Sequence, residues 1–338
     1  MKTSLKIQNL QVHFPLRGGL LPGVKRVCRA VDGLSLTISP GETLGIVGES
    51  GCGKTTLGKA ICRLVPATGG EILLDGENVL SLRGKNLLRF RRSVQMIFQD
   101  PAESLNPRQT VGQILEEPLS IHKVGKSSER KERIREILEE VGLDPSAADR
   151  YPFEFSGGQR QRIGIARALV LEPSLIICDE AVSALDVSVQ SQILNLLLEL
   201  QKKHGFAYLF ISHDLAVVRH VADRIAVMYL GKVVEEASRE VLFSNPLHAY
   251  TRALISAIPS ADPLAKKKRI LLEGDVPSPI DPPPGCAFAW RTYLPCTPEE
   301  ASRPGEFIEA EPAHWVEAHP GTIENYAERF PEIDRVAN

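Results

Sequence analysis

Five short apolar runs recur along the first 230 residues of the chain. The runs are mostly apolar throughout instead of alternating with polar residues, which is typical of strands covered on both faces. The runs are Leu44–Val47, Val94–Phe98, Leu175–Cys178, Tyr208–Ile211 and Ile225–Met228. We expect each run to form a buried strand.

Segments with a helical period lie between these runs. Lys54–Leu64 and Val189–Lys203 repeat their apolar residues three and four positions apart, which gives each segment one apolar stripe. Strands that alternate with helices in this way predict an α/β fold with a mainly parallel sheet.

The pattern changes at two places. From Pro101 to Glu154 the strand signals stop, and Ser128–Val141 has apolar residues at helical spacing, so we expect a helical insertion. After Gly231 the pattern becomes irregular, and Asp275–Gly285 is so rich in proline that it predicts an ordered extended segment or a linker. From residue 299 onward ten acidic and three basic residues give a net charge of −7, and we expect this tail to be partly disordered or loosely packed.

Composition narrows the class of protein. The 338 residues indicate two domains, or one large domain with an extension, and the net charge of −2 lacks the strong basic excess usual in nucleic-acid-binding domains. No apolar run is long enough to span a bilayer, and the N-terminus has no secretion signal. Six scattered cysteines without C-x-x-C pairs favour a reducing cytosol over a disulfide framework.

A glycine-rich run follows the first predicted strand and precedes the first predicted helix. It reads Gly48, Glu49, Ser50, Gly51, Cys52, Gly53, Lys54 and Thr55, with Thr56 next, and matches G-x-x-x-x-G-K-[ST]. Glycines let backbone N–H groups surround a phosphate, and the helix that follows adds its positive end. Lys54 would reach the β- and γ-phosphates and Thr55 would bind Mg²⁺, so the run predicts a nucleoside triphosphate with Mg²⁺.

Polar residues follow three further predicted strands. Asp179 and Glu180 end one strand, where Asp179 suits Mg²⁺ through a water and Glu180 suits activation of the attacking water. Gln99 and His213 follow two others. Taken singly, an acidic pair is often a solvated strand end, a histidine is often structural, and a glutamine is often a loop amide. Their shared place favours function, because parallel α/β sheets bind ligands at the carboxyl edge.

A second anion-binding helix start is predicted near residue 156. Ser156, Gly157, Gly158 and Gln159 precede an apolar helix, with Ser156 as a natural N-cap and the glycines exposing backbone N–H groups. A plain capped helix is the alternative. One nucleotide seldom needs two such helix starts from one subunit, so the functional interpretation implies a second subunit at the same triphosphate.

Together these residues resemble the ATP-binding cassette (ABC) ATPases, in the order of that family. The resemblance implies a P-loop NTPase fold with an antiparallel N-terminal part, and a head-to-tail dimer in which Ser156 and Gly158 act in trans. It also implies that Gln99 senses Mg²⁺ and water, that Glu180 is the catalytic base, and that His213 holds the γ-phosphate. Asp186 would link the two sites. Phe14 matches the aromatic residue that stacks on adenine, although a phenylalanine near a strand end is as often part of a core.

Further segments resemble the ATPase subunits of oligopeptide and dipeptide importers, in particular their F component, over residues 5–292. They are Gln95–Pro101, Ser104–Arg108, Arg150–Glu154, Asn245–Leu254 and Leu272–Ile280. The resemblance implies a partner ATPase (a heterodimer, with a homodimer as the alternative), two membrane subunits and an external solute-binding protein. It implies a peripheral position on the cytoplasmic face of the inner membrane. The Gln99–Arg108 region and the helical insertion would form the groove that receives a helix of the membrane partner.

The expected division is an ABC ATPase domain at 1–240, with a helical subdomain at about 101–168, followed by a short irregular C-terminal extension at 241–338 with an acidic tail. Ala181 stands where the family usually has proline, and Phe155 replaces the commoner leucine. Related subunits often carry a cysteine cluster near the C-terminus, but only Cys286 and Cys296 stand here, with Thr292 at a third place. An iron–sulfur cluster normally needs four thiolates, so none is predicted.

The basic run Lys266–Arg269 favours a solvated or lipid-facing surface over nucleic-acid binding. Importers of nickel or sugars, and an ABC ATPase that acts on nucleic acid, remain alternative functions. The nucleic-acid class generally carries two cassettes, a long coiled coil or zinc sites, and the sequence has one P-loop, no sustained heptads and no paired C-x-x-C. A regulatory subunit without catalysis conflicts with the presence of Lys54, Asp179, Glu180 and His213.

Overall fold

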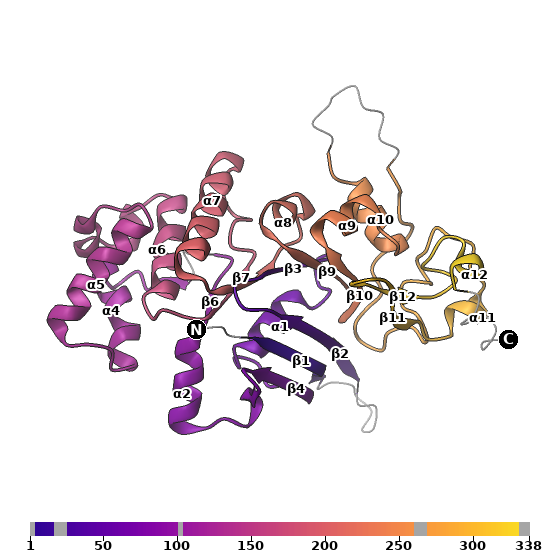
Figure 1. The fold of residues 1–338 in the computed structure, drawn as a ribbon, viewed down its shortest axis with the longest axis horizontal. Coiled ribbons are helices and arrows are strands. Elements are labelled where there is room, and N and C mark those ends of the chain that lie inside the picture. Colours follow the sequence, from indigo (N-terminus) through magenta and orange to yellow (C-terminus); the bar gives the residue numbers. More distant parts are fainter. Residues whose placement is uncertain (1–3, 17–25, 101–103, 260–268, 331–338) are drawn as a thin grey trace.

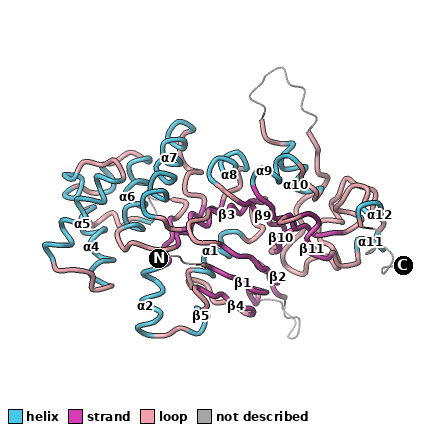
Figure 2. The backbone as a smooth tube through the Cα atoms, in the orientation of Figure 1, coloured by secondary structure: helices cyan, strands magenta, loops and turns pink. Residues whose placement is uncertain are grey.

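The computed structural model describes residues 4–16, 26–100, 104–259 and 269–330 (Figures 1 and 2). The strands are β1 (Leu5–Pro15), β2 (Val27–Ile38), β3 (Thr43–Val47), β4 (Gly69–Leu74), β5 (Glu77–Asn78), β6 (Val94–Ile97), β7 (Leu175–Asp179), β8 (Ala207–Ile211), β9 (Arg224–Tyr229), β10 (Lys232–Ser238), β11 (Glu306–Glu311) and β12 (His314–Ala318). The helices are α1 (Lys54–Ile61), α2 (Gly84–Ser93), α4 (Val111–Ile121), α5 (Ser127–Glu140), α6 (Gly157–Leu169), α7 (Val187–His204), α8 (Leu215–Val221), α9 (Arg239–Ser244), α10 (Ala249–Ser256), α11 (Pro298–Ala301) and α12 (Tyr326–Arg329).

The main sheet has the strand order β11-β12-β10-β9-β3-β8-β7-β6. The five strands predicted from apolar runs form its parallel part, with β6, β7, β8, β3 and β9 side by side. Their side chains are buried on both faces because helices cover one face and α1 with the second sheet covers the other, as Figure 1 shows. The α/β fold with a mainly parallel sheet is therefore confirmed.

The N-terminal residues form a separate antiparallel sheet in the order β2-β1-β4-β5. One face of this sheet packs on α1, whose Leu57, Ala60 and Ile61 are completely buried. Helix α1 therefore lies between the two sheets, and the residues that precede it are held from both sides.

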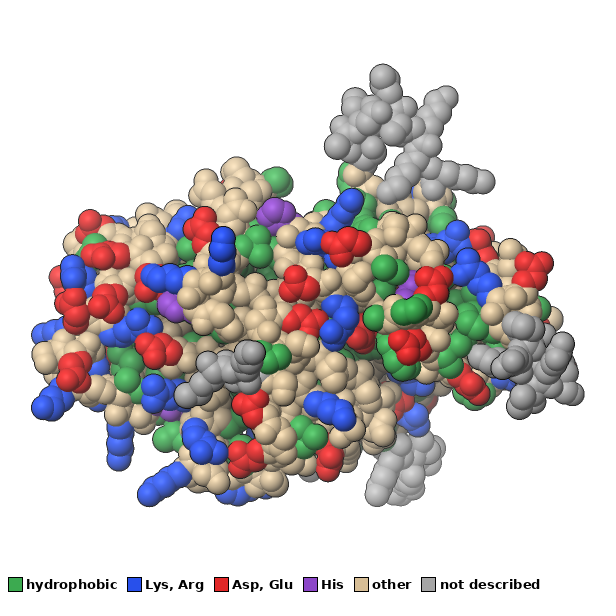
Figure 3. Space-filling model, viewed as in Figure 1, with side chains coloured by type: hydrophobic (Ala, Val, Ile, Leu, Met, Phe, Trp, Pro, Cys, Tyr) green, Lys and Arg blue, Asp and Glu red, His purple; other side chains and the backbone are tan. Residues whose placement is uncertain are grey.

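Helices α4, α5 and α6 form a helical arm at one end of the molecule (Figure 1). Ile134, Ile137 and Leu138 of α5 are buried against its neighbours, which is the apolar stripe predicted for this segment. Acidic and basic side chains are interspersed on the face of the arm seen in Figure 3. The helical insertion predicted from the spacing of apolar and charged residues is therefore present.

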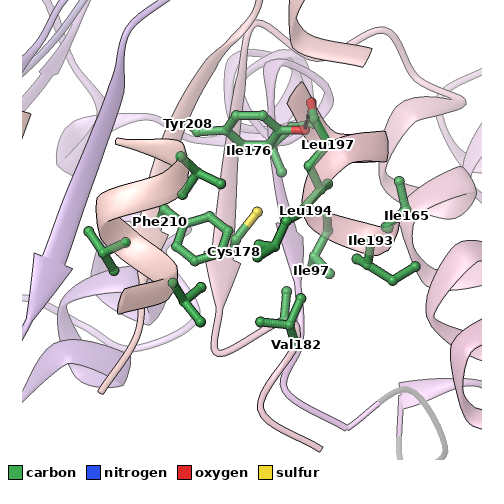
Figure 4. Packing of buried hydrophobic residues seen from close by; sticks show 14 of the residues in the cluster. Ile97, Ile165, Ile176, Cys178, Val182, Ile193, Leu194, Leu197, Tyr208 and Phe210 are labelled. Carbon is green, nitrogen blue, oxygen red and sulfur yellow. Dashed lines mark hydrogen bonds between the residues drawn. The ribbon is translucent and has the colours of Figure 1, made fainter. Parts of the chain in front are cut away.

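Figure 4 shows the core beneath α7. Ile176 and Cys178 of β7 pack beside Tyr208 and Phe210 of β8, and Leu194 of α7 covers them. All five side chains are buried, and each large one contributes about 1.5–3 kcal/mol by leaving water. This packing fixes the ends of β7 and β8, which carry residues of the candidate site.

The C-terminal tail is not irregular, and our prediction of disorder or loose packing past Glu299 is wrong for the residues that the structure describes. Strands β11 and β12 form a hairpin that extends the main sheet, with Val316 paired to Glu235 of β10. Glu306, Glu309 and Glu311 lie exposed on β11, the edge strand. Charge on an edge strand opposes pairing with strands of other chains. These acidic residues, from which we predicted disorder, therefore belong to an ordered edge strand.

The proline-rich segment Asp275–Gly285 is ordered and extended. Ile280 forms a bridge with Cys28 of β2, and the Arg29 N–H donates to the Pro279 carbonyl at 2.9 Å. Of the basic run, residues 266–268 lie outside the described residues, as do residues 331–338 at the end of the acidic tail. Within the described ranges, no helix has the length and apolarity needed to cross a membrane.

Candidate functional site

The P-loop, residues Gly48–Thr55, begins directly after β3 and wraps around the start of α1. Gly48, Gly51 and Gly53 have φ values of 153°, 80° and 106°. A Cβ at Gly53 would lie 2.0 Å from the Ala30 carbonyl oxygen, and one at Gly48 would lie 2.1 Å from that of Met228. Both positions therefore require glycine, because of the close backbone approach as well as the conformation.

Lys54 folds back over the P-loop. Its Nζ donates to the carbonyls of Gly48 at 2.7 Å and Glu49 at 2.9 Å, and the side chain is almost fully buried. Cys52 is buried and accepts from Gly231 N–H through its carbonyl at 2.9 Å, whereas Ser50 is exposed and Thr56 is half-buried on α1. The Lys54 side chain thus lies within the P-loop and is hydrogen-bonded to the backbone at its start.

Thr55 and Asp179 meet across the sheet. The Thr55 hydroxyl donates to Asp179 Oδ1 at 2.9 Å. Burial raises the pKa of Asp179, and the hydrogen bond from Thr55 with the charge of Lys59 offsets part of that rise. Hydroxyl and carboxylate oxygens are the hard donors that Mg²⁺ prefers, so this pair fits a Mg²⁺ ion.

Gln99, Glu180 and His213 converge although they come from three different strand ends. Gln99 Nε2 donates to Glu180 Oε2 at 3.0 Å, and His213 Nδ1 lies 3.1 Å from the same oxygen. Glu180 has a left-handed φ of 50°, a conformation that is costly for a glutamate. Its N–H donates to the Ile211 carbonyl at 2.9 Å, which fixes the carboxylate beside β8.

Strand order explains why these residues meet. β6, β7, β8 and β3 are consecutive neighbours and parallel, so their carboxyl ends share one edge. Gln99, Asp179 with Glu180, His213 and the P-loop follow those four strands in turn. The sequence prediction of one polar edge is confirmed.

The segment Ser156–Gln159 lies at the start of α6. Ser156 Oγ accepts from the Gln159 N–H at 3.3 Å, and Gln159 Oε1 accepts from the Ser156 N–H at 3.0 Å, which is a capping box. Ser156, Gly157 and Gln159 are exposed, and Gly158 approaches Val189 of α7. No hydrogen bond in the described part of the chain joins this segment to the P-loop, so the structure does not bring these two predicted elements together.

Phe14 and Asp186 lie at the surface. Phe14 pairs with Cys28 across β1 and β2 and is 38% exposed, so it is a partly exposed strand residue and not a buried core residue. Asp186 precedes α7, is exposed, and makes no cap bond with its side chain. Both side chains are accessible to a ligand or a second subunit.

Sequence reasoning missed two residues at this site. Tyr250 and Arg291, far along the chain, both contact Glu49 of the P-loop. Tyr250 lies within the segment Asn245–Leu254 that resembles the importer ATPases, but nothing in that segment indicates a contact with the P-loop, and Arg291 lies in none of those segments. Both contacts cross about two hundred residues of sequence.

A family model described as "ABC transporter" matches residues 31–183, and one described as "Oligopeptide/dipeptide transporter, C-terminal region" matches residues 234–294. The chain is 50% identical over 323 residues to the oligopeptide transport ATP-binding protein AppF of Bacillus subtilis (strain 168), covering 94% of this chain and 97% of that protein. It is also 50% identical to the oligopeptide transport ATP-binding protein OppF of Escherichia coli (strain K12), covering 93% and 95%.

Among solved structures, the fold is similar to the ATP-binding cassette MJ0796, a dimer bound to ADP and Pi in a post-hydrolysis state. The TM-score is 0.61 at 31% identity, and the match covers 70% of this chain and 98% of that chain. Two matched models, two relatives at 50% identity over nearly full length and the polar sheet edge agree. The chain belongs to the ABC transporter ATP-binding proteins, in their oligopeptide/dipeptide branch.

Proposed function

We propose that this chain hydrolyses ATP at the carboxyl edge of its parallel sheet and that hydrolysis drives import of oligopeptides or dipeptides. The observation that carries the proposal is the convergence of Gln99 and His213 on one oxygen of Glu180, next to the P-loop. A carboxylate held on two sides has its remaining lone pairs available to accept a proton from water.

The residues divide the work by their positions. The P-loop N–H groups and Lys54 bind the phosphates, and Phe14 stacks on the adenine. Thr55 and Asp179, with Gln99 nearby, would hold Mg²⁺, which neutralises charge on the phosphate oxygens. Glu180 accepts the proton of the attacking water, and His213 holds the γ-phosphate.

A second cassette completes the site. Ser156 and Gln159 are exposed at the start of α6 and share no hydrogen bond with the P-loop in the described part of the chain, and Asp186 is exposed at the start of α7. These features support a head-to-tail dimer in which this segment of each subunit covers the triphosphate of the other. We propose a heterodimer with a related ATPase, with a homodimer as the alternative.

This chain has a groove in which a helix of a membrane partner could dock. A cavity of about 750 Å³ is lined by Gln95, Phe98, Glu117, Ile121 and His122 at β6 and α4, and it extends to Thr55, Gln99 and Asp179 of the nucleotide site. The groove supports docking of a helix from one of two membrane subunits, and the partner ATPase would receive the helix of the other. The chain would be held peripherally at the cytoplasmic face of the inner membrane. An external solute-binding protein would deliver the peptide.

The domain division follows the same logic. We propose an ATPase domain at 1–240, with the helical subdomain at about 101–168, and an extension at 241–338 that shares the main sheet through β12. An iron–sulfur cluster is not part of the proposal, because such a cluster normally needs four thiolates and only Cys286 and Cys296 stand in this part of the sequence.

Two measurements test the function. The purified chain should bind a fluorescent ATP analogue and hydrolyse ATP with Mg²⁺, and Lys54→Ala should abolish both. The chain, produced with the membrane proteins that co-purify with it, should support uptake of a labelled tripeptide in cells that lack peptide import. Uptake of nickel or a sugar instead, or co-purification of DNA, would reject the peptide proposal.

A further inference from the structure

Glu49, the second residue of the P-loop, is held by the C-terminal region. Arg291 donates from Nη1 to Glu49 Oε2 at 2.6 Å and from Nη2 to Oε1 at 3.2 Å. The Glu49 N–H donates to the Tyr250 hydroxyl at 2.8 Å. A two-pronged arginine–carboxylate contact is among the strongest polar contacts in proteins, because both charges and both bond directions match.

Arg291 is itself fixed in place. Its Nε donates to the Gly274 carbonyl at 3.1 Å, and its backbone N–H donates to the Phe288 carbonyl at 2.8 Å. The side chain is only 10% exposed, so water competes weakly for its donors. The guanidinium therefore acts as a rigid clamp and not as a mobile surface charge.

Tyr250 is anchored by an aromatic cluster. Its ring lies 4.9 Å from that of Tyr229 and 5.5 Å from that of Phe288, measured between ring centroids, and all three residues are almost fully buried. Tyr229 is the last residue of β9, which pairs with β3 next to the P-loop. The hydroxyl that meets Glu49 is thus supported by the core of the molecule.

Glu49 connects this support to the lysine of the P-loop. Its carbonyl accepts from Lys54 Nζ, its N–H donates to Tyr250, and its carboxylate binds Arg291. Moving Glu49 would move an acceptor of Lys54, and with it the cation that meets the phosphates. The C-terminal region is attached elsewhere by the β10–β12 pairing and the bridge of Cys28 to Ile280, so this contact is not needed to tether it.

We propose that Arg291 and Tyr250 are positioning residues that hold the P-loop in its nucleotide-binding shape, so that the C-terminal region raises the affinity for ATP. The proposal rests on the function proposed above, namely that ATP binds to the P-loop. Because Gln99, Glu180 and His213 lie outside these contacts, the clamp acts on binding and leaves the catalytic step intact.

The test is equilibrium binding of a fluorescent ATP analogue to the full chain, together with ATPase kinetics. Arg291→Gln should raise the dissociation constant about tenfold, because two charge-assisted bonds are lost, while Arg291→Lys should recover part of the loss. KM should rise in parallel and kcat should stay within about twofold. Tyr250→Phe should have a smaller effect, about threefold, because one neutral hydrogen bond is lost.

A double-mutant cycle identifies the contact. Glu49→Gln should weaken binding alone but add little in the Arg291→Gln background, because the two residues act as a pair. The matched control is Arg26→Gln, which removes an exposed ion pair with Asp281 of the same C-terminal region without touching the P-loop. Its affinity should equal that of the wild type.

Two results would overturn the proposal: an Arg291→Gln affinity within about twofold of the wild type, or an equal loss in Arg26→Gln, which would indicate general loosening. Melting temperatures of all variants separate weakened binding from unfolding. If the wild-type chain itself fails to bind the analogue, the proposed function fails, and that outcome is distinct from failure of the clamp.

Discussion

Two glutamate–histidine pairs lie in different regions of the molecule and differ in nearly everything except composition. At the nucleotide edge, His213 lies 3.1 Å from Glu180, with the histidine side chain 54% exposed. At the C-terminal hairpin, His314 Nε2 lies 2.8 Å from Glu235, and both side chains are fully buried. Glu235 also accepts from the N–H groups of Leu247 at 2.7 Å and His248 at 3.1 Å.

The difference shows what separates a reactive group from a structural one. The carboxylate of Glu235 is enclosed by three donors that join β10, β12 and the start of α10, so it has no access to a substrate. Glu180 has two side-chain neighbours on one oxygen and lies at the open edge of the sheet. Residue type alone does not distinguish the two pairs, whereas burial and remaining acceptor capacity do.

The largest expected effect is on turnover. Glu180→Gln removes the proton acceptor while keeping the shape, so the ATPase rate should fall about 10²- to 10⁴-fold. Binding of a fluorescent ATP analogue and the melting temperature should stay close to wild type. The ATPase rate is measured as the steady-state rate of phosphate release. An undiminished rate would exclude Glu180 as the base.

The next effect should appear in stability and not in turnover. Glu235→Ala leaves His314 and two backbone N–H groups without their acceptor in a dry environment, so unfolding free energy should fall by about 3–5 kcal/mol. Urea denaturation measures this loss. A loss below about 1 kcal/mol would mean that water reaches the pair and would contradict its assignment as buried.

Replacing the histidines should sharpen the contrast. His213→Ala should lower the ATPase rate at least about tenfold but change unfolding free energy by less than about 0.5 kcal/mol, since the side chain is largely exposed. His314→Ala is the matched variant, with a clear loss of stability and a normal rate per folded molecule. Exchange of these two outcomes would reverse the roles that we assign.

The smallest expected effect is local opening of the β11–β12 hairpin in Glu235→Ala. The labelling rates of two buried thiols report this opening. Burial raises the pKa of Cys62, the C-cap residue of α1, to about 12, and it also raises the pKa of Cys286, which contacts Glu317 of the hairpin. In Glu235→Ala the hairpin should detach more often, so iodoacetamide should label Cys286 at least about tenfold faster. Cys62 should keep its slow rate, as mass spectrometry of the labelled peptides would show; equal acceleration of both thiols would indicate global unfolding instead.

The nucleotide edge could be predicted from the sequence because its information is local. The strands that carry site residues are mostly apolar runs, and Gly48 and Gly53 are positions in the P-loop where a Cβ would collide with neighbouring backbone. Parallel pairing of these strands then places their carboxyl ends at the same edge of the sheet. Gln99, Glu180 and His213 thus meet as expected, although their hydrogen bonds required the structure.

The C-terminal region could not be predicted in the same way. Three of the six residues of Glu306–Glu311 are glutamates, as suits an edge strand, so its charge resembles that of an acidic tail. His314 and Glu235 are separated by 79 residues, and their contact can be recognised only when β12 is known to pair with β10. Buried polar contacts between distant segments leave no periodic trace in the sequence.

The pairing of Glu49 with Arg291 also has a consequence for biosynthesis. The two residues are 242 positions apart, and ribosomes add about 5–20 residues each second, so Glu49 leaves the ribosome on the order of ten to fifty seconds before its partner exists. During that interval the nascent cassette has a P-loop without its clamp. A chain that is terminated early therefore lacks the last support of its nucleotide site, even when every residue of the cassette has been made.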